Sequence, residues 1–245
     1  MIDLHTHVLP GIDDGADDLA AAVAMCRAAA ADGCETLFAT PHQRTEHWDN
    51  GDLELLAELR RQVEEAAGGS PRIAAGAEIR VGSSLLDDLA DPTANGLQPL
   101  ADSKYLLLEL SRYVPPPDPV GLTHELIVAG WTPIYAHPEL IPYLARDPGL
   151  LHDLAAAGAL FQVTAASVTG EMGRDTRTLC RRMLDDDLVH FVASDAHGVT
   201  WRPPGLAAVR RAIAARWGEE TADRVTRGNP RAVLEDRPLQ VPAAH

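Results

Sequence analysis

The chain has 245 residues, enough for one large domain or two small ones. Its apolar fraction of 46% and charged fraction of 23% are typical of a globular protein with a sizeable core. The formal net charge is −15, from 36 acidic and 21 basic residues. So acidic a surface repels nucleic-acid phosphates and anionic membranes, which argues against general binding to either.

The N-terminal segment and the cysteines indicate a compartment. Residues 1–11 (MIDLHTHVLPG) lack the basic and apolar segments of a signal peptide, and no apolar run approaches the ~20 residues of a membrane span. Cys26, Cys34 and Cys180 are too few for a disulfide framework, so we interpret them as buried thiols. We expect a cytoplasmic protein without membrane insertion.

Strand-like and helix-like patterns alternate along the chain. Glycines such as Gly33, Gly130 and Gly158 follow the helical patterns, as expected at helix ends. The elements expected in chain order are a strand over 1–7, a helix over 17–32, a strand over 34–40, a helix over 52–67, a strand over 72–79, a short helix over 83–90, a strand over 105–110, a helix over 119–129, a strand over 132–136, a helix over 148–157, a strand over 159–164, a helix over 175–186, a strand over 188–194, a helix over 205–217 and a last short helix over 219–227.

Seven strands interleaved with helices predict an α/β protein with a parallel sheet. Several strands are nearly continuous apolar runs, which suits strands buried on both faces. A closed β/α barrel, which needs about 250 residues, fits the length, and an open doubly wound sheet is the alternative. No GxGxxG follows the first strand, which argues against a dinucleotide-binding fold. We expect one domain over residues 1–245, with an irregular tail after about Pro230.

Potential metal ligands lie at or just after the C-terminal ends of six of the seven predicted strands. Active sites of β/α barrels are built at that end. The candidates, together with an aspartate in the loop after the first strand, are His5, His7, Asp14, His42, Glu78, Glu109, His137, Asp195 and His197.

Two pairs have the spacing of neighbours on one strand face. In His5-Thr6-His7 and Asp195-Ala196-His197, the i and i+2 side chains point the same way and can reach one cation. His42 and His137 each follow a strand, but either alone is as typical of a cap or a surface residue.

Two glutamates interrupt apolar strands. Glu109 lies within YLLLEL and Glu78 follows IAAGA, and a buried unpaired carboxylate costs several kcal/mol. Each therefore needs a cation, a hydrogen-bond network or protonation, and the alternative to a metal is a buried salt bridge to an arginine. Asp14 lies in an Asp-Asp-Gly segment that is also typical of a turn or helix cap.

Nine nitrogen and oxygen donors without a cysteine suit manganese, iron, zinc or magnesium rather than a structural zinc. Nine donors are too many for one ion, so two or three divalent ions bridged by a carboxylate are expected. Such ions, about 3.5–4 Å apart, act as a clamp for displacement at phosphorus.

The motifs, in order, resemble the PHP (polymerase and histidinol phosphatase) superfamily, and most closely its bacterial capsule and exopolysaccharide tyrosine phosphatases. The resemblance runs from residue 1 to about 202 and is carried by IDLHTHVLPGIDDGA, FATPH, GAEI, LLLEL, YAHPE and ASDAH.

This resemblance implies a distorted seven-stranded, TIM-like barrel with a trinuclear site. One metal would take His5, His7, Glu78 and Asp195; a second would share Glu78 and take Glu109 and His137; a third would take Asp14, His42 and His197. It further implies manganese, with iron or zinc as alternatives, and a metal-bridging hydroxide that attacks phosphotyrosine, so that no cysteine nucleophile is needed. The implied partner is the tyrosine-rich tail of a kinase that controls polysaccharide export.

The chain departs from this family pattern at two positions. The family often has a phosphate-binding arginine three residues after the HPE histidine, where this chain has Leu140, and a second histidine after TPH, where it has Gln43. The second family arginine matches Arg202, which is either a phosphate ligand or an exposed surface residue. Arg44, Arg112 and Arg146 are the candidates to replace the missing guanidinium.

Three functions follow in order of preference. The first is a phosphomonoester hydrolase acting on protein phosphotyrosine in the control of capsular or exopolysaccharide synthesis. The second is a small-molecule phosphatase resembling histidinol phosphatase, or another metallohydrolase acting on an amide or phosphodiester. The third is a non-catalytic metal-binding module, against which the presence of all nine donors argues.

Overall fold

A computed structural model describes residues 1–239. Its strands are parallel and include the seven predicted ones, of which the third is interrupted; the short strand His42–Gln43 lies beyond the second predicted strand, which was expected to end at residue 40. The strands are β1 (Ile2–Thr6), β2 (Thr36–Ala39), β3 (His42–Gln43), β4 (Arg72–Ala75), β5 (Glu78–Arg80), β6 (Tyr105–Glu109), β7 (Thr132–Ala136), β8 (Leu160–Thr164) and β9 (Phe191–Ala193).

The interruptions divide the barrel wall into two hydrogen-bonded sheets. One has the order β1-β2-β4 and the other β3-β5-β6-β7-β8-β9. Pro41 separates β2 from β3, and Gly76 lies between β4 and β5, where a Cβ atom would come 2.8 Å from a Leu100 methyl group. A parallel bridge between Thr6 and Ala196 joins the first strand to the segment after β9, as in the distorted barrel that the family resemblance implies.

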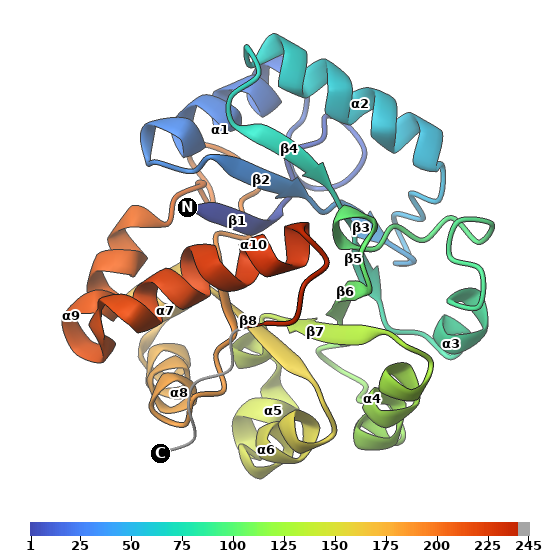
Figure 1. Cartoon of the computed structure of the whole chain (residues 1–245), viewed down its shortest axis with the longest axis vertical. Helices are drawn as coiled ribbons and strands as arrows, with labels where there is room; N and C mark the ends of the chain where they lie inside the picture. The colour runs from blue at the N-terminus through green and yellow to red at the C-terminus, as the bar shows by residue number, and fades with distance from the viewer. Residues whose placement is uncertain (240–245) are drawn as a thin grey trace.

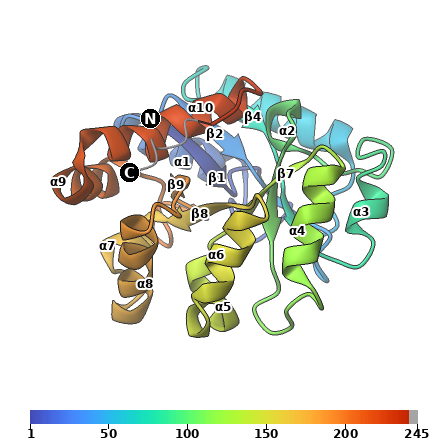
Figure 2. The ribbon, with the colours of Figure 1, turned by 60° about the horizontal axis from the view of Figure 1, so that its bottom comes forward.

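Helices surround the strands (Figures 1 and 2). They are α1 (Leu19–Ala31), α2 (Leu53–Ala66), α3 (Leu85–Asp88), α4 (Pro119–Val128), α5 (Pro142–Arg146), α6 (Gly149–Ala156), α7 (Ala165–Thr169), α8 (Arg174–Asp185), α9 (Ala207–Asp223) and α10 (Asn229–Leu234), with 3₁₀ turns η1 (Leu100–Asp102) and η2 (Pro138–Leu140) and a π-helical turn η3 (Arg224–Gly228). No helix among residues 1–239 combines the length and apolar character needed to cross a bilayer.

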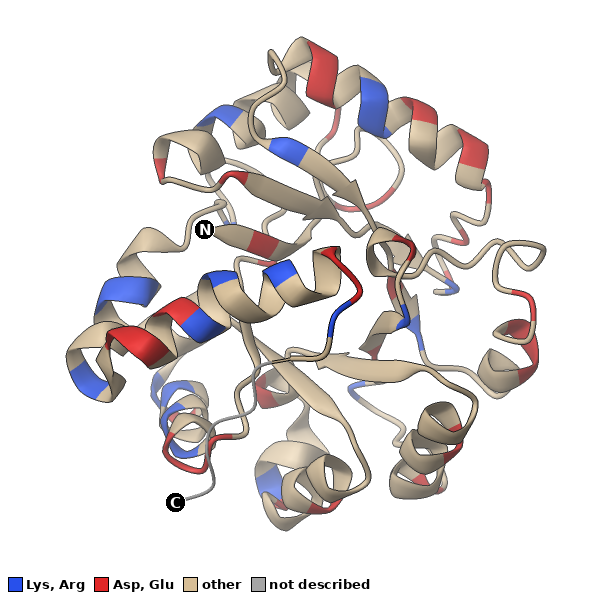
Figure 3. Cartoon of the chain, in the orientation of Figure 1, with Lys and Arg blue, Asp and Glu red and all other residues tan. Residues whose placement is uncertain are grey.

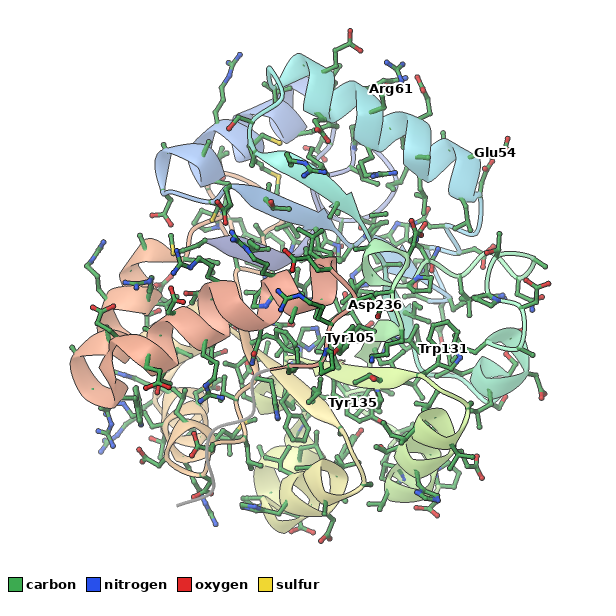
Figure 4. The ribbon with its side chains drawn as sticks, viewed as in Figure 1. Glu54, Arg61, Tyr105, Trp131, Tyr135 and Asp236 are labelled. Carbon is green, nitrogen blue, oxygen red and sulfur yellow. The ribbon has the colours of Figure 1, made fainter. Side chains whose placement is uncertain are left out.

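Aspartates begin three of the longer helices. The carboxylates of Asp18, Asp52 and Asp118 accept hydrogen bonds from backbone N–H groups in the first turns of α1, α2 and α4, at 2.8–3.0 Å. This capping satisfies donors that the helix itself leaves free. Charged residues lie mainly on the helices and loops (Figure 3), and the side chains of Glu54 and Arg61 project outward from α2 (Figure 4).

The core has two layers. Inside the barrel, alternate strand residues such as Phe38, Leu107 and Phe191 pack together. A larger outer layer between strands and helices holds the three free cysteines, which are buried as predicted. Burial raises the pKa of the Cys26 thiol to about 12, so the thiol is unreactive at neutral pH.

The predicted irregular tail after about residue 230 is wrong for residues 230–234, which continue helix α10. Pro230 occupies the first turn, where a missing N–H costs nothing, and Val233 packs into the inner core. Farther along, the Tyr105 hydroxyl donates to the Arg237 carbonyl at 2.7 Å, and Asp236 accepts from the Lys104 N–H (Figure 4). This segment is too short for a helical period to be recognised in the sequence. The helices α5 and α7 were not predicted because they, too, are short.

His190 makes the stability of the fold depend on pH. Its Nδ1 atom accepts a hydrogen bond from the Phe161 N–H at 3.1 Å. Burial lowers the pKa of His190 to about 4, and the charge of Arg224 adds to this effect. The folded state therefore favours the neutral ring, so its stabilisation is complete above about pH 6.5 and is lost as the pH falls toward 4.

The variant His190→Asn keeps an acceptor but cannot titrate. The wild type is expected to lose about 2–3 kcal/mol relative to this variant between pH 7.5 and 4.5. Urea unfolding of both proteins at the two pH values measures this difference. Parallel pH dependence of the two proteins would contradict the assignment.

Candidate metal centre

The nine residues selected from the sequence surround one cavity at the C-terminal ends of the strands. The cavity has a volume of about 520 Å³. Its walls include Asp14, His42, Glu78, Glu109, His137, Asp195 and His197. His5 and His7 are fully buried beneath it, with their Nε2 atoms 3.4–3.5 Å from oxygens of Glu78 and Asp195. The structure thus brings all nine side chains together.

An irregularity in β1 turns its histidines toward the cavity. Asp3 pairs with Leu37 but Thr6 pairs with Ala39, so β1 has one residue more than β2 between these pairs. Ile2 and Leu4 lie in the inner core, and simple alternation would place His5 on the opposite side. An extra residue reverses the alternation beyond it, which explains how a strand can direct apolar side chains and then His5 to the same interior.

Each of these two histidines is held through its Nδ1 atom. His5 Nδ1 lies 2.9 Å from Gln162 Oε1, and His7 Nδ1 lies 2.8 Å from a carboxylate oxygen of Asp13. These acceptors fix the proton on Nδ1 and leave a lone pair on each Nε2. The two Nε2 atoms face one another at 3.1 Å, an arrangement that is repulsive by itself and that a shared cation stabilises.

The loop after β1 can approach His7 only because residue 15 is glycine. A Cβ atom at Gly15 would lie 2.0 Å from the His7 carbonyl oxygen. The Gly15 N–H donates to Asp13 at 3.0 Å, and the Ala16 N–H donates to the His7 carbonyl. The Asp-Asp-Gly segment therefore forms a turn, which was one of the two interpretations of the sequence. The same turn places both aspartates at the site, as the other interpretation required for Asp14.

Glu78 lies at the centre of the cluster. Its Oε1 atom is 2.7 Å from His137 Nε2, and its Oε2 atom is 3.0 Å from His42 Nδ1. Burial alone would raise the pKa of Glu78, but the surrounding imidazoles, His5 first, hold that pKa well below its usual range. Glu78 is thus a buried carboxylate anion in contact with histidines from three different strand ends.

Glu109 is in a different electrostatic environment. Burial and the neighbouring Glu78 raise its pKa. Arg80 Nη2 lies 2.9 Å from Glu109 Oε2, so the arginine partner that was the alternative to a metal is present for this residue. Arg80 ends the short strand β5 and was not singled out in the sequence.

Asp14 joins the two histidines farther from the barrel axis. Its Oδ1 atom lies 3.4 Å from both His42 Nε2 and His197 Nε2. Its side chain is 40% exposed, so this group faces the solvent side of the cavity. Burial lowers the pKa of His42, but hydrogen bonds to Asp14 and Glu78 outweigh burial and raise it to about 11.

Among residues 1–239, three sets of donor atoms lie close enough to hold an ion. Within each set the atoms are within 4.8 Å of one another. The sets are His7, Asp14, His42 and His197; His5, His7 and Asp195; and His42, Glu78 and Glu109. His7 and His42 each belong to two of these sets. In the grouping implied by the family resemblance, each of them binds a single metal. His137 belongs to none of the three, although it touches Glu78.

The donor set suits divalent cations. Buried oxygens of Glu78, Glu109 and Asp195 lie beside imidazole or guanidinium groups but accept no well-directed hydrogen bond from them, and His42 Nδ1 likewise has no well-directed partner. Unsatisfied buried acceptors are costly, and cation coordination is one way to satisfy them. Oxygen and imidazole ligands without sulfur fit manganese, iron, zinc or magnesium.

Two residues that hold the histidines were missed in the sequence. Gln162 is a polar residue inside an otherwise apolar strand, and Asp13 precedes the predicted ligand Asp14. Both features were visible as patterns, but nothing in the sequence tied either one to a particular histidine. Such partners fix the tautomer and orientation of a metal-binding imidazole.

Arg202 and Arg112 face the cavity from opposite loops. Arg202 contacts the Asp195 carboxylate, and its Nη1 atom lies 3.4 Å from His197 Nε2, so it belongs to the site rather than to open surface. Trp201 and Leu140 line the same cavity, and Trp48 stacks on His42 with ring centroids 5.3 Å apart.

Known proteins resemble this chain over most of its length. The family model described as capsular polysaccharide synthesis, CpsB/CapC, matches residues 1–235. Tyrosine-protein phosphatase YwqE of Bacillus subtilis is 36% identical over 206 residues, which cover 82% of this chain and 79% of YwqE. Tyrosine-protein phosphatase CpsB of Streptococcus pneumoniae is 30% identical over 245 residues, with 97% and 99% covered.

Solved structures agree with this result. A crystal structure from work on YwqE and CpsB, described as metal-dependent tyrosine phosphatases, superposes with a TM-score of 0.91 at 31% identity and covers 98% of this chain and 96% of that one. The phosphotriesterase from Mycobacterium tuberculosis has a TM-score of 0.60 at 13% identity over 96% and 94% of the two chains, which shows a shared barrel fold alone. By the family match and by these relatives, the chain belongs to the CpsB/CapC family of capsular polysaccharide synthesis proteins.

Proposed function

We propose that this protein is a metal-dependent phosphatase that removes phosphate from tyrosine in proteins. The observation that carries the proposal is the convergence of nine nitrogen and oxygen donors from separate strand ends on one cavity that also holds guanidinium groups. The names of the relatives, which are tyrosine-protein phosphatases, support the same substrate.

The proposed ligands are His5, His7, Asp14, His42, Glu78, Glu109, His137, Asp195 and His197, holding two or three ions with Glu78 shared between two of them. Manganese is the proposed metal, with iron and zinc as alternatives. When bound, divalent ions would activate water as a nucleophile and neutralise charge on the phosphate. Asp13 and Gln162 would keep the imidazoles in the tautomer that presents Nε2 to the ions.

The remaining walls of the cavity fit an aryl phosphate. Leu140, Ile141, Pro142, Ala145, Met172 and Trp201 provide apolar surface beside the donors. Trp201 is 61% exposed, so the site is reachable by a tyrosine on another protein. Arg202 would bind phosphate oxygens, and its guanidinium lies 5.5 Å from the Trp201 ring. A phosphoryl group beside an apolar wall matches the polarity of phosphotyrosine.

The biological setting is part of the same proposal. The family description places such proteins in capsular polysaccharide synthesis. We propose that the substrate is the tyrosine-rich tail of a kinase that controls polysaccharide export, and that residues 1–245 act as a single domain. The three unpaired, buried cysteines favour the reducing cytoplasm.

A substrate comparison tests this function. Protein loaded with Mn²⁺ is expected to hydrolyse a phosphotyrosine peptide with a kcat/KM about 10- to 100-fold above that for histidinol phosphate, because burying the aromatic ring contributes about 1.5–3 kcal/mol. Iron- and zinc-loaded samples measured in parallel identify the preferred metal.

Two other results would redirect the assignment. Faster turnover of histidinol phosphate, or of a phosphodiester, would indicate the small-molecule phosphatase or another metallohydrolase. Failure of the fully metal-loaded protein to hydrolyse even p-nitrophenyl phosphate would indicate a non-catalytic metal-binding module.

A further inference from the structure

Among the side chains that line the cavity, carboxylic acids outnumber arginines by five to two, so each guanidinium matters for phosphate binding. The acidic residues are Asp14, Glu78, Glu109, Glu139 and Asp195, and the two arginines are Arg112 and Arg202. A phosphate monoester is an anion that guanidinium groups bind in a bidentate manner.

The guanidinium of Arg202 already contacts other side chains of the protein. It contacts the Asp195 carboxylate, and its Nη1 atom is 3.4 Å from His197 Nε2. Arg202 and Arg112 line the same cavity, each from its own loop.

The guanidinium of Arg112 is available to bind a ligand. Arg112 lies in the segment between β6 and α4, three residues after Glu109, and this loop extends beyond the strand ends (Figure 2). Its side chain is exposed and lines the cavity. Within residues 1–239 it forms no ion pair. Arg80, on the neighbouring strand β5, instead pairs with Glu109 at 2.9 Å.

The other candidate arginines are positioned differently. Arg44 donates to the Asn95 carbonyl at 2.7 Å and lies 3.7 Å from Asp88. Arg146 ends α5, is exposed, and is not among the residues that line the cavity. Leu140 does line the cavity, but it offers only an apolar side chain there.

We propose that Arg112 is a second phosphate-binding residue, which approaches the phosphate from the loop after β6 while Arg202 approaches it from the segment after β9. This inference rests on the proposed phosphatase function and adds a substrate-contacting residue to it. An uncommitted guanidinium on an exposed loop can turn toward an anion without breaking an existing ion pair.

The test compares Arg112→Gln and Arg112→Lys with the matched control Arg146→Gln, which removes an exposed arginine outside the cavity. The dissociation constant of inorganic phosphate is measured by calorimetry on Mn²⁺-loaded protein, the metal content by elemental analysis, and KM with a phosphotyrosine peptide. Arg112→Gln is expected to weaken phosphate binding and raise KM by about 10-fold, with metal content unchanged. Arg112→Lys should show a smaller loss, and Arg146→Gln less than a twofold change.

A double variant checks that the guanidinium itself is responsible. Adding Leu140→Arg to Arg112→Gln returns a guanidinium to the same cavity and is expected to recover most of the lost phosphate affinity. The inference is overturned if Arg112→Gln binds phosphate as Arg146→Gln does, if it loses metal, or if the double variant recovers nothing while keeping its metal.

The readouts separate this inference from the proposed function. Wild-type protein that binds phosphate more tightly than Arg112→Gln but hydrolyses no phosphoester would overturn the phosphatase function and support the binding role. Active wild-type protein with unchanged phosphate binding in Arg112→Gln would overturn only the binding role.

Discussion

Replacing Glu78 with glutamine is expected to remove about two metal ions per chain and to lower phosphatase activity by at least about 1000-fold, because lost ions take several kcal/mol of transition-state stabilisation with them. Glu78 touches His42 and His137 at 3.0 and 2.7 Å and lies within 3.5 Å of His5 and His7. Glutamine keeps the shape of the side chain but removes the charge that several donor groups share.

The comparison variant is Asp14→Asn. Among residues 1–239, the Asp14 carboxylate forms ion pairs only with His42 and His197, and its side chain is 40% exposed. Its replacement is expected to affect a single ion. Elemental analysis of both purified variants after identical metal loading measures the difference. Equal metal loss in the two variants would contradict the proposed sharing of Glu78.

The variant Asp13→Ala is expected to weaken metal binding by about 10- to 100-fold, although Asp13 is not itself a proposed ligand. Its carboxylate accepts from His7 Nδ1 at 2.8 Å, from the Gly15 N–H at 3.0 Å and from the His42 N–H at 3.2 Å. Without it, the His7 ring is free to change tautomer and to turn its Nε2 atom away from the cluster.

Asp17→Ala provides the control for this experiment. Asp17 is an exposed residue of the same loop. Titration of metal-free protein with Mn²⁺ gives the affinities of the wild type and both variants. Equal affinities in Asp13→Ala and Asp17→Ala would show that His7 does not depend on Asp13 for its orientation.

The sequence alone determined the fold class and the composition of the candidate site. Strands with nearly continuous apolar residues, alternating with helices, suit burial on both faces and therefore predict a parallel sheet, either closed into a barrel or open. The same pattern predicts that residues following different strands meet at one end. That is why His5, His42 and Asp195 could be grouped although they are far apart in the chain.

Only the tertiary structure decided how these side chains are oriented. The extra residue in β1 reverses the strand alternation before His5, and no local signal in the sequence predicts it. Gln162 holds His5 from a separate strand, β8, whereas Asp13 holds His7 from the turn that follows β1. The choice of Arg112 over Arg44 and Arg146 likewise depends on which guanidinium faces the cavity. Sequence periodicity reports which residues are buried, whereas ligand geometry depends on long-range contacts that form only when the barrel closes around them.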